Sequence, residues 1–327
     1  MKKVLFATTA LVASAGIASA QGVEVTGYAE MGIFGGEDAT GASIETQFHT
    51  DIDVTFTMSG ETDNGLTFGA SIDLDESDGT DTVCTVLPCT VNGDSDAFDA
   101  DRQGGESVFL SGNFGTITMG DTDGAFDWAL TEAIIGGAIQ DDHEHAGYSG
   151  NAGLDGIHDG QVARYDYSFG DFAFAVSAEI DDAGAAGAST AFGIGGRYSG
   201  DLGGVGLGVG LGYQTGETGG TQFDIIGISL DATFDNGIQA ILNYSDLDGY
   251  GGNDSHMGVA FGYSMDALTI AVNYGVFDRT VGADNEGYGL IVNYDLGGGA
   301  EVQFGYGHSD RAGTTQDTFS LGVAMTF

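Results

Sequence analysis

The residues best equipped for chemistry lie in residues 121–160, where the alternation of apolar with small or polar residues, which marks most of the chain, stops. This stretch holds the only tryptophan, Trp128, and three of the six histidines. Carboxylates suit Ca²⁺, whereas imidazoles suit transition metals. Candidate metal ligands are therefore Asp141, Asp142 and Glu144, in the run Asp-Asp-His-Glu-His that ends at His145. A solvated run of charges is the alternative, and no cofactor is required.

Further carboxylates stand at the entry of the same stretch. Asp121, Asp123 and Asp127 are compatible with a Ca²⁺ site or with the lining of a channel, and we favour the lining, together with Glu132. Apolar clusters at residues 126–130 and 134–139 indicate that the stretch packs against other parts of the protein rather than forming a mobile surface loop.

Catalysis finds little support. A hydrolase needs Ser, His and an acid or amide in a fixed constellation, and the chain has no G-x-S-x-G elbow. Apart from His49, the histidines lie in expected loops or at strand ends. Calcium-binding β-roll repeats need a sustained Gly-Gly-x-Gly-x-Asp period, of which residues 251–254 are an isolated fragment. We therefore expect a protein that is not an enzyme.

The beginning of the chain predicts export. Residues 1–20 combine Lys2 and Lys3, a short apolar run and a small-residue cleavage site, as secretory signals do. In an oxidising compartment Cys84 and Cys89 are expected to form a local disulfide. A metal pair is the alternative, but it lacks further thiols.

The charge balance restricts the partners. Without the signal segment, five basic residues face 49 acidic ones, a formal charge of −44. Such a surface repels nucleic acid and favours cations. With 42% hydrophobic and 10% aromatic residues, the chain is nevertheless able to build a packed structure.

Period-two alternation is the main structural signal. Residues 44–59 place Ile, Phe, Val and Met at even positions and polar residues at odd ones, which predicts a strand. The pattern recurs to give about 16 strands, joined alternately by short turns and by longer, mostly acidic segments, among them residues 215–221, 246–255, 278–284 and 309–316. No stretch after residue 20 approaches the length of a spanning helix. Short turns at one end and long loops at the other are typical of an outer-membrane β-barrel. We expect a single barrel domain over residues 21–327, narrowed by the folded-in stretch 121–160.

The chain resembles the general porins of the bacterial outer membrane, specifically the alphaproteobacterial type. The likeness is carried by residues 56–60 with 66–71, 108–115 with 119–121, and 288–290 with 294–300, and by the terminal Phe327. The resemblance implies a homotrimer of 16-stranded antiparallel transmembrane barrels in the outer membrane of a Gram-negative bacterium. It also implies that the third external loop folds into the lumen, and that residues 76–105 reach a neighbouring subunit.

The resemblance also implies an eyelet in which acidic loop residues oppose arginines on the barrel wall. This chain departs from that pattern, because the wall carries Asp51, Asp53 and Glu30, whereas Arg164 and Arg197 are its few inward cations. We therefore expect an eyelet that is acidic on both sides. The predicted function is passive diffusion of ions and small hydrophilic solutes through a water-filled, weakly selective, cation-preferring channel in outer-membrane lipid. The alternative is a plugged structural or adhesive barrel.

Overall fold

The computed structural model describes residues 22–75, 105–151, 162–180, 190–218 and 220–327. Within them the chain forms sixteen strands and one short helix. The helix, α1, spans Ala125–Ala129. The strands are β1 (Gly22–Glu37), β2 (Ser43–Glu61), β3 (Thr67–Asp75), β4 (Ser107–Gly112), β5 (Gly115–Gly120), β6 (Val162–Phe169), β7 (Phe172–Glu179), β8 (Ala191–Asp201), β9 (Val205–Thr218), β10 (Thr221–Phe234), β11 (Ile238–Asp248), β12 (Asn253–Met265), β13 (Leu268–Arg279), β14 (Asn285–Gly297), β15 (Ala300–Arg311) and β16 (Thr314–Thr326).

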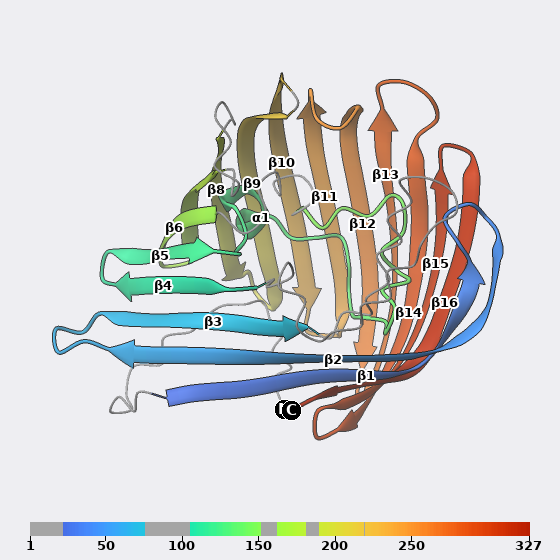
Figure 1. Cartoon of the computed structure of the whole chain (residues 1–327), viewed down its shortest axis with the longest axis horizontal. Helices are drawn as coiled ribbons and strands as arrows, with labels where there is room; N and C mark the ends of the chain where they lie inside the picture. Colours follow the sequence, from blue (N-terminus) through green and yellow to red (C-terminus); the bar gives the residue numbers. More distant parts are fainter. Residues whose placement is uncertain (1–21, 76–104, 152–161, 181–189, 219) are drawn as a thin grey trace, which may run out of the picture.

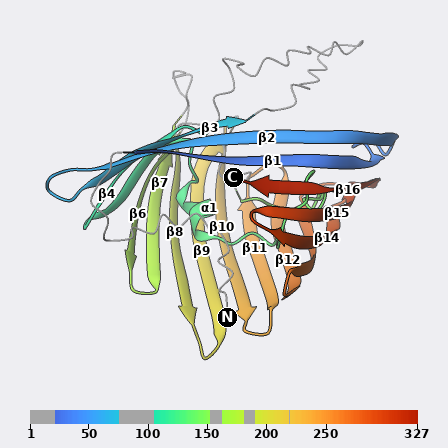
Figure 2. The ribbon, with the colours of Figure 1, turned by 90° about the horizontal axis from the view of Figure 1, so that it is seen from below.

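The strands close into one antiparallel barrel. Each strand pairs with its neighbours in sequence, and β1 pairs with β16 from Tyr28↔Thr326 to Gly36↔Thr318. Figures 1 and 2 show the closed wall from two sides. Closure leaves no unpaired sheet edge, which lipid would not tolerate. The predicted all-β fold of about 16 strands is confirmed. No helix in the described part of the chain is long and apolar enough to cross a membrane.

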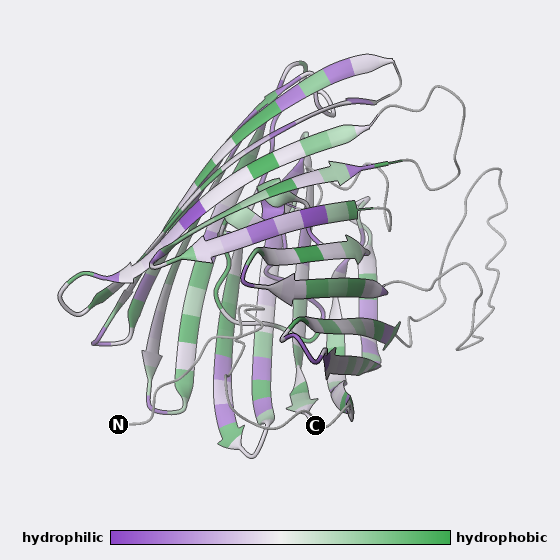
Figure 3. Cartoon of the chain, turned by 90° about the vertical axis from the view of Figure 1, so that its left-hand side faces the viewer, coloured by the Kyte–Doolittle hydropathy of each residue, from purple (hydrophilic) through white to green (hydrophobic). Residues whose placement is uncertain are grey.

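The two faces of the wall differ in polarity. Large apolar side chains point outward and remain exposed on almost every strand, among them Ile52, Ile72, Phe174, Leu211, Phe261 and Leu321. The alternate positions point inward and are mostly polar or glycine, so hydropathy alternates along the strands (Figure 3). An apolar exterior around a polar lumen is the arrangement of a membrane barrel.

The connections differ from expectation in the C-terminal half. We expected a loop over residues 309–316, but β15 and β16 continue their pairing to Arg311↔Thr314. Their turn is two residues long, Ala312 at φ 53° and Gly313 at φ 96°, as a type I′ hairpin requires. Expected loops at residues 215–221, 246–255 and 278–284 are shortened in the same way. Polar residues occupy both faces at these strand ends, so the backbone pairing between strands continues although the alternation of apolar residues has ended.

Several predictions fall outside the described residues. These are the signal segment 1–20, the cysteine pair Cys84 and Cys89, and the last part of the stretch 121–160, from residue 152 onward.

Candidate functional site

Residues 121–151, here called the inner loop, lie inside the barrel. In Figure 1 the segment that follows α1 runs across the inner faces of the strands from β9 toward β14. Its apolar side chains pack on the wall in two clusters. Phe126 and Leu130 pack with Phe223, Ile225 and Leu247, among others. In the second cluster Ala133, Ile135 and Ala138 meet Ala260, Ala271 and Ile291. The expectation that the two apolar clusters pack against other parts of the protein is confirmed.

Glycines on the wall let the inner loop come this close. A Cβ atom at Gly210 would collide with the carbonyl oxygen of Ala129, and one at Gly275 with that of Gly147. Similar clashes would arise beneath the loop at Gly195, Gly227, Gly258, Gly289, Gly307 and Gly322. The loop therefore lies against the wall along a track of glycines, on strands from β8 to β16.

Polar side chains of the wall satisfy the backbone of the inner loop, which has little secondary structure of its own. Ser229 Oγ accepts from Thr131 N at 2.8 Å, and Asn243 Nδ2 donates to Thr131 O at 2.9 Å. Further along, Asn273 Nδ2 donates to His143 O at 2.9 Å, and Ser309 Oγ accepts from Ala146 N at 2.9 Å. His256 Nε2 lies 3.0 Å from Gly147 O. Buried backbone groups need such partners, which explains why the inward face carries Ser, Asn and His.

The inner loop turns its acidic residues toward the lumen. Asp142, His143 and His145 are buried against the wall, whereas Asp141 and Glu144 are exposed. Although the Glu144 side chain is exposed to the lumen, the surrounding barrel partly desolvates it, and this desolvation, then the neighbouring Asp141 and Glu132, raise its pKa to about 7. Burial also raises the pKa of Glu132, whose carboxylate accepts from the Tyr148 hydroxyl at 2.5 Å. These carboxylates lie close enough to repel one another.

The wall formed by β1 and β2 faces the far end of this loop with more carboxylates. Glu30 and Asp51 are paired across the two strands, and Asp53 follows two residues on along the inward face. Burial, then repulsion from Asp51, raise the pKa of Asp141. Glu30 Oε2 lies 3.1 Å from Nε2 of His49, whose Nδ1 is 2.8 Å from Nε2 of Gln140.

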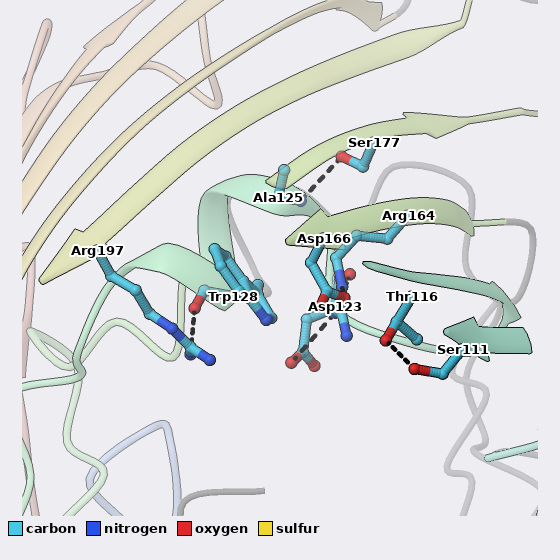
Figure 4. Close-up of polar contacts among 9 residues, drawn as sticks. All are labelled: Ser111, Thr116, Asp123, Ala125, Trp128, Arg164, Asp166, Ser177 and Arg197. Carbon is cyan, nitrogen blue, oxygen red and sulfur yellow. Dashed lines mark hydrogen bonds and ion pairs between the residues drawn. The ribbon is translucent and has the colours of Figure 1, made fainter. Parts of the chain in front are cut away.

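The two arginines hold the first turn of the inner loop (Figure 4). Arg164 Nη1 donates to Asp123 O at 2.7 Å, and its guanidinium lies 3.7 Å from the Asp123 carboxylate and 3.5 Å from that of Asp166. Arg197 Nη1 donates to Trp128 O at 3.1 Å, and its guanidinium carbon stands 3.9 Å from the centre of the Trp128 ring. Both are inward as predicted, but both are engaged by the loop.

Two of the predicted lining residues lie at the beginning of the inner loop. Asp121 accepts from Gly105 N at 2.6 Å and donates its own N–H to Glu106 O at 2.9 Å. It thus ties the beginning of the inner loop to the chain before β4. Asp127 lies in α1, whose N-terminus Ser177 fixes by accepting from Ala125 N at 2.8 Å (Figure 4).

The predicted metal ligands are not brought together. Asp142 is buried under Gly305, whereas Asp141 and Glu144 face the lumen. Within the described ranges no group of three or more His, Cys, Asp or Glu residues is arranged to hold a metal ion. The local alternation of the loop separates neighbours in sequence onto opposite faces, so a set of ligands adjacent in the chain is divided.

The site residues that the sequence did not predict are His49 and Gln140. His49 did carry a signal, because it stands on the inward face of a clear strand, two residues before Asp51. Gln140 carried none, and Trp128 stood out only as the single tryptophan, since their contacts depend on where an irregular segment meets the wall.

Known proteins share this architecture. The family model described as Gram-negative porin matches residues 7–314. The chain belongs to the Gram-negative porin family. It is 29% identical to a porin of Rhodobacter capsulatus over 346 aligned positions, covering 93% of this chain and 100% of that protein.

Two solved porin structures are similar in fold to this chain. A refined porin structure matches with a TM-score of 0.70 and 25% identity, over 94% of this chain and 100% of the other. A triple mutant of Rhodopseudomonas blastica porin matches with a TM-score of 0.64 and 19% identity, over 93% and 100%. This porin is therefore an outer-membrane channel of a Gram-negative bacterium, for passive diffusion of small hydrophilic solutes. Its relatives are channels rather than enzymes.

Proposed function

We propose that this porin prefers cations, and that carboxylates on both sides of the opening beside the inner loop set the preference. The observation that carries the proposal is the contact of Gln140 with His49 on β2 at 2.8 Å, which brings the next loop residue, Asp141, to the part of the wall that carries Asp51. Glu30 stands beside Asp51 on the wall, and on the loop Glu144 is close enough to Asp141 and Glu132 to be repelled by both. Rings of acidic side chains select cations in channels.

The arginines offset this charge only in part. Arg164 is matched by Asp123 and Asp166, and Arg197 is held against Trp128. Cations are thus enriched near the carboxylates and cross the membrane down their own gradient. The inner loop sets the upper limit on the size of the solutes that pass. We propose that the gradient alone drives this passage and that no cofactor is needed.

We further propose that three copies assemble in the outer membrane. Support comes from the resemblance to trimeric porins and from the short strands β4 and β5, whose outer face exposes Val108, Leu110, Ile117 and Met119. The mass of the detergent-solubilised protein, measured by analytical ultracentrifugation, tests the trimer. A monomeric mass in mild detergent would contradict it.

The reversal potential across a KCl gradient in a planar bilayer tests the ion preference. The wild type is expected to open in steps and to prefer K⁺. Asp51→Asn/Asp53→Asn should weaken the preference, whereas Asp63→Asn/Asp266→Asn, which removes two charges from the short turns, should change it little. A preference for Cl⁻ would overturn the charge argument and leave the channel intact. Absence of conductance would instead favour a plugged barrel.

A further inference from the structure

The middle of the inner loop makes a specific contact with β1, β2 and β16, on the side of the barrel away from α1. Residues 138–141, here called the loop tip, form a tight turn in which Asp141 N donates to Ala138 O at 2.9 Å. Ile139 of the tip is 2% exposed and sits over Gly32 of β1 and Gly322 of β16. This packing is apolar and has no directional element, so it does not by itself fix the orientation of the tip.

A chain of hydrogen bonds supplies the direction. Gln140 Nε2 lies 2.8 Å from His49 Nδ1, and His49 Nε2 lies 3.1 Å from Glu30 Oε2. Tyr28 donates its hydroxyl to Glu30 Oε1 at 2.5 Å. Because an amide nitrogen only donates, His49 accepts at Nδ1 and carries its proton on Nε2, which donates to Glu30. Every group in the chain from Tyr28 to Gln140 therefore has a defined role.

We propose that His49 is the positioning residue that fixes the loop tip, and with it the opening of the channel. Its Nδ1 atom is the acceptor that holds Gln140, and Glu30 orients the ring. The inference rests on the protein being an open channel but not on the proposed cation preference, because tip motion affects current whichever ion carries it.

Because of its position, the contact between His49 and Gln140 affects the opening of the channel. Ser177, Ser229, Asn243 and Asn273 hold other parts of the inner loop, from α1 to residue 143. His49 acts at the tip, 91 residues away in sequence from the residue it holds. Asp141 directly follows Gln140, its side chain is exposed, and it is repelled by Asp51, two residues from His49 on β2. Release of Gln140 would thus move an acidic side chain that faces the lumen.

Two substitutions of equal charge separate the two nitrogen atoms of His49. His49→Asn keeps an acceptor near the position of Nδ1 and loses the donor toward Glu30. His49→Gln keeps a donor near the position of Nε2 and loses the acceptor for Gln140. Open-channel current noise and brief closures in symmetric KCl report tip motion, whereas the reversal potential in a gradient reports ion preference separately.

We expect His49→Asn to resemble the wild type, and His49→Gln to increase the ratio of displaced to docked tip by about two- to tenfold, the effect of one lost hydrogen bond. Gln140→Ala should match His49→Gln, since Gln140 is exposed and its removal leaves the wall intact. The double variant His49→Gln/Gln140→Ala should be no noisier than either single variant.

Two results would contradict the role proposed for His49. If Gln140→Ala has the noise of the wild type, the contact does not hold the tip and the inference is wrong. The same holds if His49→Asn and His49→Gln are equally noisy, because the histidine would then matter only for packing. A Gln47→Ala variant, on the same inward face of β2, serves as the control and should behave as the wild type.

Discussion

At the scale of single residues, the effect of a charge in this channel depends on its partner. Arg164 is the donor to Asp123 O and lies against two carboxylates, and Arg197 stacks on Trp128. By contrast, Asp141 and Glu144 of the inner loop are exposed toward the lumen beside other carboxylates. The arginines therefore act chiefly as anchors for the loop, and on the proposed cation preference the carboxylates dominate the field that a passing ion experiences.

Arg197→Gln tests this division of roles. Removal of the guanidinium takes a positive charge from the wall and a cation–π contact from Trp128, worth about 0.5–2 kcal/mol. The reversal potential in a KCl gradient should shift modestly toward K⁺, and brief closures should increase as α1 loosens. Arg311→Gln removes the same charge at the end of β15, where Arg311 is exposed and donates to Gln316 at 2.6 Å. Equal shifts in both variants would mean that diffuse charge, not this site, sets the potential.

Glu144 predicts how the preference depends on pH. Desolvation by the surrounding barrel and the adjacent carboxylates raise the pKa of Glu144 to about 7. A carboxyl with a raised pKa is neutral below that value and charged above it, so the K⁺ preference should grow as pH rises between about 6 and 8. The measurement is the reversal potential at a series of pH values. Glu144→Gln should flatten the profile over this interval, and an unchanged profile would exclude Glu144 as its source.

At the scale of elements, the inner loop and the wall are fitted to each other. The loop is irregular, yet its backbone finds partners in Ser229, Asn243, Asn273 and Ser309. The glycine track beneath it allows contacts that any side chain would prevent. A segment held at so many points stays against the wall, which favours an open channel over a plugged barrel.

Gly210→Ala should displace the inner loop, because the new methyl group would meet the carbonyl oxygen of Ala129 and the hydroxyl of Ser229. Gly206→Ala is a matched control on the same strand and face, where the nearest atom would be 3.7 Å away. Single-channel conductance should change in the first variant only, and proteolysis of the purified protein should cut its loop sooner. Identical behaviour of the two variants would show that close approach at Gly210 is unimportant.

The strands and the inner loop also differ in how well the sequence predicts them. Alternation over residues 44–59 predicted β2 correctly, because one strand carries its whole pattern within itself. The end of β15 was predicted wrongly, because polar pairs such as Asp310↔Thr315 continue the strand without apolar alternation. The contacts of the loop were beyond prediction. Asn273 and His143 are 130 residues apart and meet only once the barrel is closed.

At the scale of the whole molecule, the acidic composition extends the field beyond the opening. Carboxylates occur in the connections as well as on the inward face, for example Asp38, Asp266 and Asp284. Mobile ions screen such charges over a Debye length of about 30 Å at 0.01 M salt and about 3 Å at 1 M. Distant carboxylates thus contribute in dilute solution only, whereas carboxylates at the opening contribute under both conditions.

Salt concentration therefore separates the two sources of cation preference. With a fixed concentration ratio across the bilayer, the reversal potential should be largest when both solutions are dilute and should fall, without vanishing, as both approach 1 M. Asp51→Asn/Asp53→Asn should remove mainly the part that persists in concentrated salt, because these side chains stand on the inward face of β2, opposite the inner loop. The turn variant Asp63→Asn/Asp266→Asn should affect the dilute limit alone. If the preference disappears entirely at high salt in the wild type, the charge at the opening is too weak to select ions, and the acidic surface as a whole is responsible.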